Sequence, residues 1–332
     1  MSVENKTSRF VWAYETTPRT SAIVDATSIT YDFGEYDESI QKWKPPTIEN
    51  RILSSYVYNK RTPTLSDGRR KFPTFNHMFN PTTPQWLLWI LGKCTDGAPD
   101  SIEPLDSGYQ YPLTIRHEEG GGTNDTFAQA VSSWCVSAYF RAAIKDPFVV
   151  DLEFAFEQFQ DHDDEPQLTT APRRAGHTGV ERSYNGVPTV TYDPDGNDTG
   201  PTVIPQVVKA EGKITQNYSN TLNGAETAQT VYKRNYDPIP ITLQGVHVVN
   251  DYWDQFMDRN QEDWEVDIYK PDDSYYIKMK LNNCIPQTYI KEGQAFKGWY
   301  LSTLVLLCEE ITATFAWDGS DTWANHFKGE VV

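Results

Sequence analysis

The sequence predicts a mainly β protein of two domains, and three observations lead to that prediction. The chain has 332 residues, which is more than one small sandwich needs and suits two domains of roughly 100 to 150 residues. Aromatic residues make up 13% of it, and 21 prolines and 20 glycines interrupt it, a composition that favours short strands and turns over long helices. Apolar and polar residues alternate repeatedly, which is typical of strands with one buried face.

The clearest alternation is in residues 148–159, where apolar residues on one face alternate with acids on the other. The acids are Asp151, Glu153 and Glu157. Further strands are predicted at 27–36, 111–118, 130–141, 187–192, 211–218, 239–248, 263–269 and 274–284. Residues 298–317 are more uniformly apolar and long enough for one extended strand or two consecutive ones, which indicates the centre of a sheet.

Two short helices are expected, one in each half of the chain. The first spans 84–91, where Thr83 can cap the helix, Pro84 takes the first helical position and Gly92 ends the run. Its residues are apolar all round, so it is predicted to pack against a sheet. The second helix is predicted at 251–258 from apolar residues at helical spacing.

The order strand, long excursion, helix and strands occurs in both halves, which indicates a duplicated domain. The N-terminal domain is predicted at 1–159 and includes a basic long loop or hairpin at 38–72. An acidic connection rich in proline and glycine follows at 160–205. The C-terminal domain is predicted at 206–318, and a tail at 319–332 ends the chain.

The charge balance excludes some classes of partner. Asp and Glu number 46 against 29 Lys and Arg, which gives a net charge of −17, and such a field repels nucleic acid and anionic membranes. No apolar run approaches the roughly 20 residues of a membrane span, and the N-terminus has no apolar signal-peptide core. We therefore expect a soluble protein made in a cytoplasm, with no sequence-specific DNA binding.

The four cysteines lie far apart along the chain, at Cys94, Cys135, Cys284 and Cys308. No CxxC pair is present, so neither a zinc ribbon nor a redox motif is predicted. Buried free thiols are the favoured interpretation. Disulfides between Cys94 and Cys135 and between Cys284 and Cys308 stay open, because sequence does not give the distances that a disulfide requires.

Three clusters of polar residues contain ligand or acid–base types, and each has a simpler explanation. Asp161–Glu165 is an acidic run in which neighbouring side chains point apart, so a solvated loop is favoured over a metal site. A calcium loop requires a glycine at its sixth position, but Asp193–Asp198 has its glycine at the fourth. A turn is therefore favoured over a calcium site. His117 precedes two glutamates and three glycines without a nucleophile motif.

No catalytic, metal or cofactor-binding residue is therefore assigned, and the chain is predicted not to be an enzyme. A carbohydrate-active enzyme with paired carboxylates stays open as an alternative, because the separation of the carboxylates in space decides that chemistry.

Three segments, TSRFVWAYETTPRTSAIVDATSITYDF, NPTTPQWLLWILGKC and WCVSAYFRAAIKDPFVVDLEFAF, resemble the tail tube proteins of viruses with long, non-contractile tails. The resemblance implies β-sandwich domains with a flanking helix, whose strands join those of neighbouring subunits in a barrel around a lumen. It implies a structural virion protein that forms stacked rings, contacts other tail proteins at the tube ends and lets DNA pass without specific binding.

Rings of three chains are expected if both halves are tube domains, and otherwise rings of six. The virion tail is the expected location, after assembly in the host cytoplasm. Asp151, Glu153 and Glu157 are candidates for an acidic lumen lining, although an outward face explains them equally well. Another virion component, such as a tail terminator, an adaptor or a capsid protein, is a further alternative.

Overall fold

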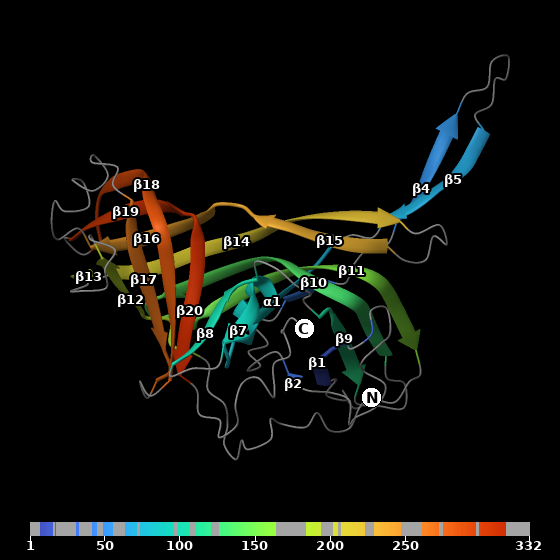
Figure 1. Cartoon of the computed structure of the whole chain (residues 1–332), viewed down its shortest axis with the longest axis horizontal. Helices are drawn as coiled ribbons and strands as arrows, with labels where there is room; N and C mark the ends of the chain where they lie inside the picture. Colours follow the sequence, from blue (N-terminus) through green and yellow to red (C-terminus); the bar gives the residue numbers. More distant parts are fainter. Residues whose placement is uncertain are drawn as a thin grey trace, which may run out of the picture.

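The computed structural model shows a protein built mainly of antiparallel strands (Figure 1), which confirms the mainly β prediction. The structure describes residues 7–15, 17, 31–32, 42–44, 49–55, 64–71, 74–95, 99–105, 111–120, 126–163, 184–193, 202–204, 207–222, 229–246, 261–271, 275–296 and 299–316. The predicted second helix at 251–258 and the tail at 319–332 lie outside these residues.

The larger of the two main sheets, here called the long sheet, contains strands from both halves of the chain. In pairing order it comprises β3 (Lys42–Lys44), β6 (Phe75–Phe79), β11 (Val149–Asp163), β10 (Thr126–Ala143), β14 (Val207–Leu222), β16 (Ile239–Val246), β19 (Trp299–Cys308) and the C-terminal part of β18 (Tyr276–Phe296). Beside the first half of β10 lie β9 (Leu113–Gly120), β1 (Thr7–Tyr14) and β2 (Tyr31–Asp32), and β15 (Gln229–Tyr236) pairs with the end of β14.

The long strand β10 has two successive neighbours on one edge. Its residues up to Ser133 pair with β9, and those from Ser137 onward pair with β14, while β11 pairs along the other edge. At the change of partner, Ser132 has a φ of 51°. The Ser132 backbone N–H and hydroxyl donate hydrogen bonds to the buried Glu15 carboxylate, at 2.6 Å and 2.7 Å. This branch joins the two predicted domains in one sheet.

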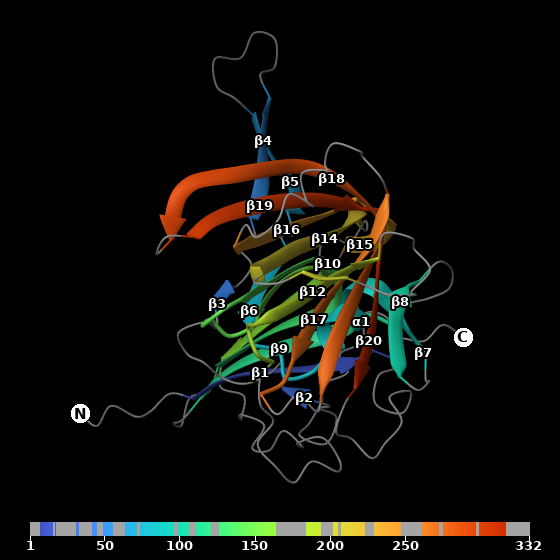
Figure 2. The same ribbon diagram turned by 90° about the vertical axis from the view of Figure 1, so that its left-hand side faces the viewer.

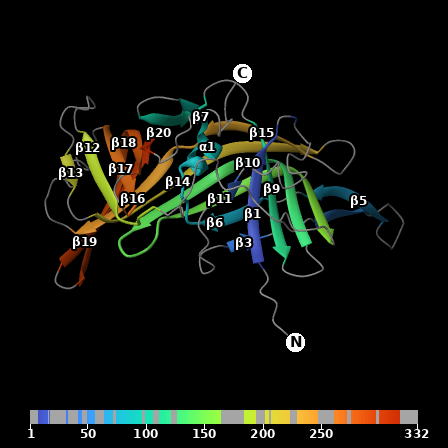
Figure 3. The same cartoon turned by 90° about the horizontal axis from the view of Figure 1, so that it is seen from below.

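The second sheet, here called the short sheet, lies at one end of the molecule (Figure 3). Its order is β13 (Thr202–Ile204), β12 (Pro188–Asp193), β17 (Glu262–Tyr269), the N-terminal part of β18, β20 (Glu310–Ala316), β8 (Asp100–Pro104) and β7 (Gly92–Thr95). β18 therefore crosses from one sheet to the other.

A disulfide between Cys284 and Cys308 lies at that crossing, where β18 changes sheets and β19 ends. It is one of the two pairings that the sequence left open, and it overturns the favoured interpretation of free thiols for these two residues. Cys94 and Cys135 are buried and not joined in a disulfide.

The predicted helix at 84–91 is present as α1 (Gln85–Leu91), and all of its residues are buried. It begins one residue later than predicted, because Pro84 is the N-cap and not the first helical residue. It packs against β10, β7 and β8. Gly92, with a φ of 97°, ends the helix as predicted. The Tyr236 hydroxyl of β15 lies 2.9 Å from the carbonyl oxygens of Ile90 and Leu91, so the second half of the chain binds the end of a helix from the first half.

Buried side chains form one main core cluster that spans both predicted domains. It includes Trp12, Trp86, Phe154, Trp264, Met279 and Leu306. The apolar faces expected from alternation are buried, including Leu152 and Phe156 of β11. Residues 298–317 form the two consecutive strands β19 and β20, and β11 continues to Asp163 because its end pairs with the start of β10.

The excursion at 38–72, for which a long loop or hairpin is predicted, contains two paired strands. β4 (Glu49–Ser55) and β5 (Thr64–Lys71) pair only with each other among the described strands. The hairpin projects from the body of the molecule (Figures 1 and 2). The connection at 160–205 contributes β12, where a strand was predicted at 187–192, and also β13.

Candidate functional site

The candidate site is the face of the long sheet that points away from the core, here called the outer face. Successive residues of a strand point to opposite sides, and residues paired across strands point to the same side. The pairing therefore identifies the members of the face. In β10, for example, Ala138, Phe140 and Ala142 are buried in the core, and Tyr139 and Arg141, which alternate with them, are partly exposed on the outer face.

The part of the outer face on β11, β10 and β14 is here called the charged region. It consists of Tyr139, Arg141, Asp151, Glu153, Lys209, Glu211 and Lys213. Asp151 is opposite Tyr139, which is opposite Lys213 on the next strand. The described face therefore carries both signs of charge.

The three predicted lumen acids differ in their exposure to water. Asp151 and Glu153 lie half-buried on the charged region as the alternation predicts. Glu153 accepts a hydrogen bond of 2.6 Å from the Thr74 hydroxyl, which precedes β6. Glu157 is only 5% exposed, so Asp151 and Glu153 are the members of this set that solvent reaches.

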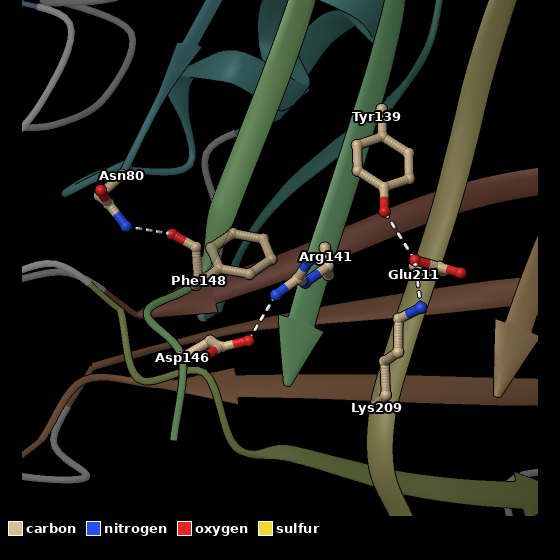
Figure 4. A network of polar contacts seen from close by, with 7 residues as sticks. All are labelled: Asn80, Tyr139, Arg141, Asp146, Phe148, Lys209 and Glu211. Carbon is tan, nitrogen blue, oxygen red and sulfur yellow. Dashed lines mark hydrogen bonds and ion pairs between the residues drawn. The ribbon is translucent and has the colours of Figure 1, made fainter. Parts of the chain in front are cut away.

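A polar network links β10 with β14 in the charged region (Figure 4). The Tyr139 hydroxyl donates to Glu211 Oε2 at 2.6 Å, and Lys209 Nζ contacts the same oxygen at 2.8 Å. Arg141 forms an ion pair with Asp146 in the turn between β10 and β11. The cations Lys209 and Arg141 therefore each have a carboxylate partner within the chain.

The network also changes the ionisation of its members. Burial, followed by the hydrogen bond to Glu211, raises the pKa of Tyr139. Burial disfavours the Glu211 carboxylate, but the hydrogen bonds from Lys209 and Tyr139 outweigh it and lower its pKa. Burial and then the nearby charge of Glu153 raise the pKa of Tyr218. At neutral pH both tyrosines are therefore neutral donors, and Glu211 is ionised.

The remaining part of the outer face, on β16, β19 and the C-terminal part of β18, is here called the neutral region. Its members are Pro240, Thr242, Gln244, Ile285, Thr288, Ile290, Leu301, Thr303, Val305 and Leu307. Ile285 is 39% exposed and Ile290 is 50% exposed. No Asp, Glu, Lys or Arg occurs in residues 239–244, 285–290 or 301–308, so the two regions of one face differ sharply in chemistry.

A second group of charges lies on the short sheet. Lys278 Nζ is 3.4 Å from Asp267 Oδ2 and 3.6 Å from Glu265 Oε1, and the Tyr269 hydroxyl donates to Asp267 at 2.9 Å. Burial and then the charge of Asp267 raise the pKa of Glu265. These are cross-strand ion pairs, in which the lysine compensates two adjacent carboxylates.

The polar clusters of the sequence are only partly described. Asp161–Asp163 belongs to the end of β11, and His117 is buried in β9, whereas residues 194–198 lie outside the described part. No group of three or more His, Cys, Asp or Glu side chains in the described ranges is arranged to hold a metal ion. Those ranges also contain no helix that is long and apolar enough to cross a membrane.

Sequence reasoning found the acids of β11 but missed their neighbours on the charged region. The signal was present, because Tyr139 and Arg141 alternate with buried residues, as do Lys209, Glu211 and Lys213. What the alternation does not contain is the register that places β14 beside β10.

Comparison of the sequence with models of known protein families found no match, and comparison with curated proteins found none either.

Proposed function

We propose that the chain is a structural virion protein that polymerises into stacked rings and forms the tail tube of a long-tailed virus. The observation that carries the proposal is the long sheet, which continues from β3 to β18 through both halves of the chain. Its first and last strands each have one edge without a partner among the described strands. Such edges are available to strands of neighbouring copies, and pairing between copies removes them from water.

The charged region provides a suitable lining for a DNA conduit. A phosphate backbone binds where lysine and arginine can replace its counterions. Two of the three cations of the charged region, Lys209 and Arg141, are instead held by Glu211 and Asp146, and the whole chain is strongly acidic. A face of this kind lets DNA move past without a site that retains it.

The projecting hairpin β4–β5 supports stacking of the rings. Residues 38–72 contain eight Lys and Arg and three Asp and Glu, whereas the chain as a whole has a net charge of −17. A basic projection is complementary to an acidic surface on the next ring. Rings contain three chains if each half contributes a tube domain, and six otherwise.

Electron microscopy of the purified protein in negative stain tests the proposal directly. The expected result is rings or tubes that lengthen with protein concentration. Assembly that stops at one ring would favour a terminator or adaptor, and a strictly monomeric particle at high concentration would contradict the proposal and favour the enzyme alternative.

Charge reversal tests the placement of the charged region in the lumen. The double variant Asp151→Lys, Glu153→Lys is expected to assemble but to deliver DNA poorly, because free lysines on the lining bind phosphate. Infectivity of virions that carry the variant is the measurement. The matched control is Glu310→Lys, an exposed acid at the start of β20 in the short sheet, and equal infectivity of the double variant and this control would exclude Asp151 and Glu153 from the lumen.

A further inference from the structure

We infer that the neutral region of β16, β19 and β18 is an interface covered by a second copy of this chain. The inference rests on the proposed function, because both require that the chain associates with itself. It goes further by naming the surface that makes the contact. The region is distinct from the charged region, where Tyr139, Arg141, Lys209 and Glu211 form hydrogen bonds or ion pairs within the chain.

The side chains of the neutral region are those of a surface that becomes buried. Ile285 of β18 is directly opposite Leu307 of β19. The next pair on the same face is Thr288 of β18 and Val305 of β19. Ile290 is 50% exposed in the isolated chain. Adjoining exposed apolar side chains gain hydrophobic stabilisation when a partner covers them.

Charge identifies the partner as another copy. Each chain carries a net charge of −17, so two copies repel each other where their acidic surfaces approach. Residues 239–244, 285–290 and 301–308 carry no charge, and contact through them buries neither a carboxylate nor an ammonium group. A foreign partner suited to this acidic protein would instead be basic, and the neutral region offers such a partner no carboxylate.

The edge of the long sheet leads to the same conclusion. From Ile285 onward, β18 pairs with β19 on one edge, and its other edge has no partner in the described part of the chain. β18 and β19 extend beyond the body of the molecule at this end (Figure 2). A second copy that covers the apolar face at this edge also brings its backbone close to the unpaired N–H and C=O groups.

The test places like charges on the neutral region. The variant Ile285→Glu, Ile290→Glu is expected to reduce the equilibrium constant for self-association by at least about tenfold, because both copies then carry buried, unpaired carboxylates. Sedimentation velocity and negative-stain microscopy measure the assembly. Ile290→Thr, which removes apolar surface without adding charge, is expected to give a smaller reduction. Circular dichroism and the thermal midpoint establish that each variant is folded.

The matched control is Val203→Glu on β13, an apolar side chain 59% exposed on the short sheet, which is expected to assemble as the wild type does. Wild-type tubes with unassembled Ile285→Glu, Ile290→Glu protein support both the interface and the tube. Tubes from both proteins would overturn the interface and leave the tube standing. A wild-type dimer that the double variant abolishes would support the interface and overturn the tube, and a wild-type monomer would overturn both.

Discussion

The charged region and the neutral region lie on the same face of the same sheet, and both alternate with core residues in the same way. They differ in how their side chains are satisfied. In the charged region, Tyr139, Lys209 and Glu211 form hydrogen bonds and an ion pair across strands. In the neutral region, Ile285 and Ile290 leave a large part of their apolar surface in water.

The pairing of strands and the use of a surface are therefore separate properties of a sheet. Backbone hydrogen bonds join the strands equally in both regions. The side chains decide that one region is stable facing water and the other gains from being covered. In the proposed tube, the charged region faces the lumen and the neutral region faces another subunit.

The largest effect is expected from Gly186, which supports the turn next to the charged region. A Cβ atom at this position would lie 1.7 Å from the Asp146 carbonyl oxygen and 2.6 Å from that of Ala143. Gly186→Ala should displace the turn, separate Asp146 from Arg141 and destabilise the fold by about 1–3 kcal/mol. Urea unfolding measures the change.

Val187→Ala is the control for Gly186→Ala, because Val187 is the next residue and 42% exposed, and it should change stability by about 0.5 kcal/mol or less. An unfolding midpoint of Gly186→Ala equal to that of the wild type would rule out the close approach. Self-association through the neutral region should persist in whatever fraction of this variant is folded.

A pH-dependent effect is expected beneath the charged region but not beneath the neutral region. His77 lies on the core face of β6, opposite Leu152, and burial followed by the charge of His117 lowers its pKa from 6.5 to about 3. The unfolded chain therefore binds a proton below pH 6.5 that the folded chain does not bind, and stability is lost as pH falls from 6.5 towards 3.

Between pH 7.5 and 5 the His77 contribution should cost up to about 2 kcal/mol. Urea midpoints measured at both pH values for the wild type and for His77→Phe provide the comparison. The pH dependence should be weaker in the variant, and an identical dependence in the two proteins would show that His77 is not the group responsible.

The smallest effect is expected from Tyr139→Phe, which removes the hydrogen bond to Glu211 within the charged region. Because the pair is only partly buried, the cost should be about 1 kcal/mol or less. Loss of the Tyr139 donor should also raise the pKa of Glu211 towards its ordinary value, since this hydrogen bond is one of the causes that lower it. NMR titration of the Glu211 carboxyl measures that change. The control is Tyr218→Phe, which lies on β14 like Glu211.

Much of the fold could be predicted from local patterns. Strand positions followed from alternation, as for Leu152 and Phe154, and the end of α1 followed from the conformational freedom of Gly92. The charged region was predicted only through Asp151 and Glu153. Tyr139 and Glu211 are 72 residues apart, and a pairing at that distance depends on loop closure and core packing that no local pattern contains.

Composition and the alternation of apolar and polar residues are enough to specify an acidic, mainly β protein with strands that have one buried and one exposed face, because alternation follows from the geometry of the strand. The tertiary structure sets which exposed faces adjoin. It joined β10 to β14 across the predicted domain boundary, placed the Cys284–Cys308 disulfide at the crossing between sheets, and brought the uncharged residues of β16, β18 and β19 together. Register between distant strands is set by the shared core, which forms only when the whole chain folds.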